Sequence, residues 1–76
     1  MYKALNIFYD RKNYMSKETF EYREAPVIYK GFDLFKCISE CHIVKEGKVV
    51  GMCVTINGCK TRIDKEEKIF NERICI

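Results

Sequence analysis

The sequence predicts a single α+β domain spanning residues 1–76, in which a small antiparallel sheet of four or five strands packs against one C-terminal helix. Three observations predict this fold. Apolar and charged residues alternate at residues 19–23, a glycine turn near residue 47 separates two apolar runs, and apolar residues follow helical spacing toward the C-terminus. The composition, 47% hydrophobic and 33% charged, is typical of a globular chain.

The first two strands are expected before the proline. Residues 1–9 fit a strand better than a helix, because the polar turn at residues 10–13 leaves too short a segment for an independent helix. Residues 19–23 have the pattern of a half-buried strand with Phe20 and Tyr22 facing inward. Pro26 ends that strand, because it has no N–H to donate to a ladder.

Residues 27–38 are predicted to form one extended run. Gly31 is interpreted as a bulge or a close approach of two backbones. Phe32 and Phe35 would point to opposite faces of the strand, so we expect a central strand or one covered by a helix.

The clearest turn signal is Glu46-Gly47, which lies between the apolar runs 42–44 and 48–54. Glycine at the second central position supplies the positive φ of a tight hairpin turn. Ser39-Glu40 is interpreted as another tight connection. A hairpin built around Gly47 is therefore predicted.

The segment 55–63 admits two interpretations. Asn57-Gly58 is a strong hairpin signal, and Asp64 would then cap a shorter helix. Alternatively, Thr55 caps a longer helix in which Asp64 and Lys68 pair on the outer face. The apolar stripe of that longer helix would comprise Ile56, Cys59, Ile63, Phe70 and Ile74. Residues 65–73 are helical in both interpretations.

Four short segments resemble small, mostly uncharacterised proteins encoded by phages and prophages of low-GC Gram-positive bacteria. These are the YKGF of residues 29–32, the GKVV of 47–50, the NGCK of 57–60 and the Ile63-Asp64 pair. The resemblance implies antiparallel strands packed by a C-terminal helix, with a helical segment before the Ile-Asp pair. It therefore favours the helix that begins at Thr55. It implies no activity and transfers no functional residue.

Charge and cysteine content indicate which partners and which cellular compartment to expect. The net charge is +3, and basic and acidic residues are interleaved: seven and five in residues 1–38, seven and six in residues 39–76. No basic block of the kind that binds a nucleic-acid backbone is present. The five cysteines form an odd set, and neither a signal peptide nor an apolar run of membrane-spanning length is evident. We therefore expect reduced thiols in the cytoplasm of a bacterial host cell, with no membrane partner.

A metal site is the first chemistry to consider. Cys37, Cys41 and His42, with Cys53 and Cys59 further on, supply enough ligands for zinc, but neither CxxC nor HxxxH spacing occurs. On a strand, Cys41 and His42 would point to opposite faces. The cysteines are therefore predicted to be small core residues, without metal or cofactor. A zinc-stabilised module is the third hypothesis.

Catalysis has equally little support in the sequence. A cysteine beside His42, with Glu40 as orienting group, is the only formal nucleophile arrangement. Nothing indicates a lowered thiol pKa, and His42 is expected on a strand surface. No phosphate-binding loop is present, because the four glycines are isolated. The protein is predicted not to be an enzyme, with no catalytic residue.

The leading hypothesis is therefore a non-enzymatic phage or mobile-element accessory protein that binds a host protein or protein–nucleic-acid complex, for example to inhibit a defence system such as CRISPR–Cas. Tyrosine residues suit a binding surface because they bury much area at low entropic cost. Pairing of the chain with itself in a homodimer would be an equally suitable interaction. The partner-binding residues predicted are Tyr2, Tyr9, Tyr14, Tyr22, Lys30 and Lys36.

The alternative is a small nucleic-acid-binding or transcription-regulating protein. Tyr29, Phe32 and Phe35 lie near Lys30 and Lys36, as in a base-stacking platform with flanking cations. The same pattern also fits a strand that buries its aromatic residues and exposes its lysines. The balanced charge favours that simpler interpretation.

Overall fold

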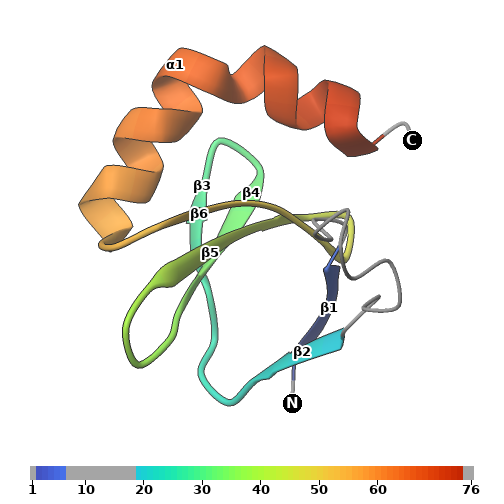
Figure 1. Cartoon of the computed structure of the whole chain (residues 1–76), viewed down its shortest axis with the longest axis vertical. Helices are drawn as coiled ribbons and strands as arrows, with labels where there is room; N and C mark the ends of the chain where they lie inside the picture. Colours follow the sequence, from blue (N-terminus) through green and yellow to red (C-terminus); the bar gives the residue numbers. More distant parts are fainter. Residues whose placement is uncertain (1, 7–18, 75–76) are drawn as a thin grey trace, which may run out of the picture.

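A computed structural model describes the chain at residues 2–6 and 19–74, without the side chains of Asn6, Arg73 and Ile74. These residues form six strands and one helix (Figure 1). The elements are β1 (Tyr2–Asn6), β2 (Thr19–Tyr22), β3 (Val27–Tyr29), β4 (Phe32–Lys36), β5 (Cys41–Lys45), β6 (Lys48–Cys53) and α1 (Ile56–Ile74). The predicted α+β class with one C-terminal helix is confirmed.

The predicted sheet was wrong in strand number and direction. The strands lie in the order β2-β1-β6-β5-β4-β3, and β1 runs parallel to β6 while every other neighbouring pair is antiparallel. Leu5 aligns with Lys48, and its N–H donates to the carbonyl of Gly47 at 2.7 Å. The first strand thus pairs with the last one. Alternation along a strand does not specify such a distant partner or its direction.

The extended run predicted for residues 27–38 is in fact a hairpin. Tyr29 pairs with Phe32, and the two residues between them, Lys30 and Gly31, have φ of +50° and +82°. Positive φ at both central positions is the geometry of a type I′ turn, so Gly31 forms a turn and not a bulge. The pattern was missed because lysine is an unusual residue at the first of these positions.

The hairpin around Gly47 is confirmed. Lys45 pairs with Lys48 across the turn, where Glu46 and Gly47 have φ of +52° and +75°. The tight connection between β4 and β5 is confirmed too, and the Cys37 N–H donates to the Glu40 carbonyl there at 2.7 Å.

The longer helix is the correct alternative for residues 55–63. Thr55 caps α1: its Oγ1 accepts a hydrogen bond from the Gly58 N–H at 3.0 Å. Cys59, Ile63 and Phe70 of the predicted stripe are buried, whereas the side chain of Ile74 lies outside the described residues.

The predicted pair of Asp64 and Lys68 is wrong. The Asp64 carboxylate instead binds Lys30 Nζ at 2.6 Å and accepts hydrogen bonds from the Tyr29 hydroxyl at 2.8 and 3.0 Å. Because the apolar stripe of α1 packs on the sheet, Asp64 lies beside the β3–β4 turn, where Lys30 and Tyr29 can both donate to it.

The sheet curls, because its two edge strands are joined by only four residues. The edges of a flat sheet of six strands would lie about 24 Å apart, since neighbouring strands are about 4.8 Å apart. The five residue steps from Tyr22 to Val27 reach about 18 Å at most. In Figure 1, α1 lies above the sheet and the connection from β2 to β3 lies below it.

The buried apolar residues form two layers, one on each face of the sheet. The helix-side core, between the sheet and α1, comprises Phe32, Leu34, Cys41, Ile43, Val50, Cys59, Ile63 and Phe70. The inner core, on the other face of the sheet, comprises Ala4, Tyr22, Phe35, Val44 and Val49. Phe32 and Phe35 lie in different layers, and β4 lies between β5 and β3 with α1 packed on one face, so the expectation of a central strand or one covered by a helix is confirmed.

His42 was predicted on the strand surface, and this is wrong. It is only 2% exposed, and its ring makes an edge-on contact with Phe20 at 4.8 Å between centroids. Cys41 belongs to the helix-side core, so the two neighbouring residues do point to opposite faces, as predicted. The curl buries His42, because it brings β2 over the face of β5.

Candidate functional site

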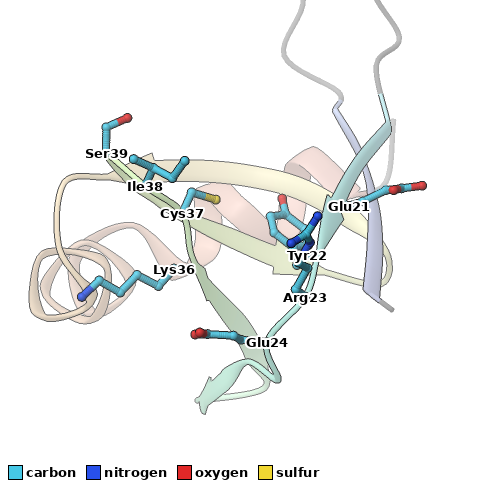
Figure 2. Close-up of a pocket in the computed structure, with 8 residues that line it drawn as sticks. All are labelled: Glu21, Tyr22, Arg23, Glu24, Lys36, Cys37, Ile38 and Ser39. Carbon is cyan, nitrogen blue, oxygen red and sulfur yellow. The ribbon is translucent and has the colours of Figure 1, made fainter.

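An open groove lies between the end of β2 and the end of β4 (Figure 2). One wall is formed by residues 21–24 and the other by residues 36–39, and the groove has a volume of about 980 Å³. The two strands meet where the Tyr22 and Phe35 rings stack, with centroids 4.1 Å apart and planes 8° from parallel. We call this open groove the β2–β4 groove.

Tyr22 and Cys37 face each other across the base of the groove. The Tyr22 hydroxyl lies 2.6 Å from His42 Nδ1, and His42 Nε2 lies 3.2 Å from Glu40 Oε1. A neutral imidazole protonated at Nε2 satisfies both contacts, because the phenol then donates to Nδ1 and Nε2–H donates to the carboxylate. This chain of hydrogen bonds joins β2 to β5 and to the β4–β5 turn.

The electrostatics at the base favour protonated groups. Burial raises the pKa of Tyr22, and the neighbouring Cys37 and Glu40 raise it further. Burial, and then Glu40, also raises the pKa of the Cys37 thiol. The thiolate is the nucleophilic form of cysteine, so these surroundings disfavour attack by Cys37.

The rim of the groove carries both signs of charge and one apolar side chain. Arg23 and Lys36 are basic, Glu21 and Glu24 are acidic, and Ile38 is fully exposed. Such mixed charge differs from the positive channels that hold nucleic acid. An apolar side chain left in water gains from being covered.

The structure places three of the predicted partner-binding residues at or beside the groove. Lys36 is part of one wall, and the exposed Tyr2 pairs in register with Tyr22. Tyr22 itself is only 5% exposed, so it forms the base of the groove and the inner core, and it contributes little contact surface. Tyr9 and Tyr14 lie outside the described residues.

Sequence reasoning missed Arg23, Glu24 and Ile38. An isoleucine inside the tight connection after β4 was a usable signal, because turns are ordinarily polar. No local signal marks Arg23 or Glu24 as groove residues. They line the groove only because the sheet curls.

Lys30 lies elsewhere, in a cluster that joins the β3–β4 turn to α1. Hydrogen bonding to Lys30, and then to Tyr29, lowers the pKa of Asp64. Lys60 Nζ lies 5.6 Å from the centroid of the Tyr29 ring. Lys30 and the Tyr29 hydroxyl both bind Asp64 within the chain, so this cluster holds the β3–β4 turn against α1.

The base-stacking platform considered from the sequence is not formed. Phe32 and Phe35 are buried in different layers, so neither offers a ring face to a nucleotide. Tyr29 is half-buried, and its hydroxyl is bonded to Asp64. The simpler interpretation of this strand, with buried aromatic residues, is the correct one.

The described cysteines are free thiols, and two of them are core residues. Cys41 and Cys59 are fully buried, and Cys59 Sγ lies 3.7 Å from the Cys41 carbonyl oxygen. Burial, followed by the charges of Cys53 and Cys41, raises the pKa of Cys59 to about 12. Within residues 2–6 and 19–74, no three His, Cys, Asp or Glu side chains are grouped so as to hold a metal ion. Cys75 is outside this range.

In the part of the chain that the structure describes, no helix has the length and apolar character needed to cross a membrane. Comparison with known proteins found no matching family model, no matching curated protein and no matching solved structure.

Proposed function

We propose that the chain is a non-enzymatic protein that binds a host protein, alone or in a complex with nucleic acid, through the β2–β4 groove and its rim. The observation that carries this proposal is the fully exposed Ile38 at the edge of an open groove with charges of both signs. Complementary groups on a partner would cover the isoleucine and pair with the rim charges.

The form of the groove supports binding better than catalysis. An active site for most reactions excludes water and places a titratable group at an altered pKa near neutrality. The β2–β4 groove is open, and its two titratable groups at the base, Tyr22 and Cys37, have pKa values shifted upward, away from neutrality. Recognition of a surface needs neither feature.

The setting of the proposal comes from the sequence. The resemblance to small phage and prophage proteins supports a mobile-element accessory protein in the cytoplasm of a bacterial host. Occupying a surface of a host enzyme or defence complex, such as a CRISPR–Cas effector, is an action that a small binding protein can perform without chemistry.

An affinity capture of the tagged full chain from host lysate, with and without nuclease, tests the proposal. We expect one stoichiometric host protein that survives nuclease, is lost with Ile38→Asp, and is retained with Ile28→Asp. Ile28 is the matched control because it is also exposed, at 71%, but lies on β3 and does not line the groove. Recovery of nucleic acid alone would contradict the proposal and favour the nucleic-acid alternative.

A further inference from the structure

We propose that the β2–β4 groove takes an extended segment of a partner protein, which adds to the outer edge of β2 as a further β-strand. This inference rests on the proposed function and specifies the mode of binding: main-chain hydrogen bonds to a strand edge, with side chains resting on the base and the opposite wall of the groove.

The wall that starts in β2 presents a strand edge with no neighbour on its outer side among the described residues. β2 is last in the strand order and pairs with β1 alone within residues 2–6 and 19–74. On the other wall, only Lys36 belongs to β4, and the Cys37 N–H is already bonded to the Glu40 carbonyl in the β4–β5 turn, so this wall offers side-chain contacts. Backbone N–H and C=O groups on an edge such as that of β2 are left to water or to an incoming chain. An extended segment is the ligand that matches them.

The size of the groove fits a short strand. The walls comprise residues 21–24 and 36–39, of which 21–22 belong to β2 and 36 to β4, so the added strand would pair with a short edge. The volume of about 980 Å³ is at the upper end of the range for ligand sites, so side chains of the added segment can be held as well as its backbone.

Side-chain alternation defines the chemical class of the segment. In β2, Phe20 and Tyr22 face the inner core, while Glu21 faces outward, 3.7 Å from Lys3. A strand added beside β2 alternates in the same way. Every second residue would then rest on the base near Tyr22 and Cys37, and the intervening residues would face solvent beside the rim charges. The expected partner segment is apolar at every second position and polar between, and it is not a polyanion.

Main-chain recognition can be tested directly with peptides. Short random peptides displayed on phage are panned on the full chain, and an enriched peptide is resynthesised with single N-methyl groups at each position in turn. A methyl group removes one N–H donor, and an added strand pairs the N–H groups of alternate residues with its neighbour. We expect N-methylation at alternate positions to weaken binding about tenfold or more, and at the intervening positions to change it by less than about threefold.

Variants of the chain locate the edge that is used. Ile38→Asp is expected to weaken peptide binding at least about tenfold, because it places a charge where an apolar contact is made, whereas Ile28→Asp should leave it unchanged. Failure to enrich any peptide, uniform sensitivity to N-methylation, or loss of binding with Ile28→Asp alone would each overturn strand addition at the groove. A dimer of the chain that Ile38→Asp dissociates, measured by light scattering, would also overturn it, because the occupant would then be a second copy.

The test separates this inference from the proposed function. A host protein captured in an Ile38-dependent manner, with no alternating N-methyl pattern in peptides, supports the function and overturns the strand. An alternating pattern without any captured host protein supports strand addition and overturns the proposed host partner.

Discussion

The Tyr22 ring lies flat against the Phe35 ring, with 4.1 Å between centroids and 8° between planes. Tyr22 is the last residue of β2, and Phe35 lies in β4. Strands β1, β6 and β5 lie between these two strands in the sheet. This contact therefore holds the curl of the sheet together from the inside. Tyr22 also lines the β2–β4 groove, so the contact joins the inner core to the groove.

Removing the Tyr22 hydroxyl should destabilise the fold without removing the ring contact. Tyr22→Phe leaves Nδ1 of the buried His42 without its partner, and an unsatisfied buried polar group costs about 1–3 kcal/mol. Tyr22→Ala also removes the stacked ring and should cost about 3–5 kcal/mol. Unfolding in urea measures both, and Tyr2→Phe at an exposed position is the control. Equal stability of Tyr22→Phe and the parent would contradict the buried hydrogen bond.

A side chain at Gly51 is expected to crowd the helix-side core. A Cβ there would lie 3.0 and 3.1 Å from two Phe70 ring carbons and 3.3 Å from Ile43 Cδ1, in the middle of the helix-side core. Gly51→Ala should therefore cost about 1–3 kcal/mol through overpacking, measured as the free energy of unfolding. Gly47→Ala is the comparison, because a Cβ at Gly47 meets no atom within 4 Å but Gly47 has a φ of +75°. It should cost about 1–2 kcal/mol through the backbone alone. A repacked Phe70 should appear as a changed aromatic NMR spectrum in Gly51→Ala only.

The cap of α1 is expected to contribute to stability. Thr55→Ala removes the acceptor for the Gly58 N–H and should cost about 1 kcal/mol. Thr61→Ala is a matched control within α1, because the Thr61 hydroxyl bonds only to the Asn57 carbonyl four residues earlier, on an exposed helix face. The two free energies of unfolding are compared by chemical denaturation. A larger loss for Thr61→Ala would argue against Thr55 as the cap.

Stability should fall in acid partly through Asp64. Its pKa in the folded chain is lowered from the ordinary value of 3.8 by hydrogen bonding to Lys30 and Tyr29. A carboxyl group with a lowered folded pKa stabilises the fold at pH values above the unfolded pKa, and this contribution is lost as the pH falls through 3.8 and then through the folded pKa. Thermal unfolding from neutral pH down to pH values below 3.8 should therefore show a smaller acid-induced loss in Asp64→Asn.

Lys30→Gln tests whether Lys30 causes the acid dependence, since Lys30 makes the largest contribution to the lowered pKa of Asp64. It should reproduce most of the change seen in Asp64→Asn. If both variants kept the acid dependence of the parent, the Lys30–Asp64 pair would not be responsible for it.

Local patterns in the sequence were enough for the elements that depend on neighbouring residues. The strand at residues 19–23, the hairpin at Gly47 and the buried stripe of α1 were all predictable, because turn geometry and side-chain periodicity act over a few residues. The N-terminus of α1 could not be decided from the pattern alone. Asn57-Gly58 is an equally good hairpin signal in isolation, and the buried contacts of Cys59 and Ile63 with the sheet favour the helix.

The β2–β4 groove could not be predicted in the same way. Its walls come from two segments that are some fifteen residues apart in sequence, and they meet only because the 23–26 connection is too short for a flat sheet. The same curl buries Tyr22, which the sequence suggested as a contact residue, and His42, which it suggested as a surface residue.

By itself, the sequence determined the α+β class, the helix-side stripe of α1 and the tight turns at Gly47 and at Ser39-Glu40, because these follow from the order of apolar, polar and glycine residues along short segments. The tertiary structure alone decided the parallel pairing of β1 with β6, the curl of the sheet, the partner of Asp64 and the groove beside Ile38. The physical reason is that long-range pairing depends on which surfaces can be buried together and on how far each connection can reach, and neither is a property of a single segment.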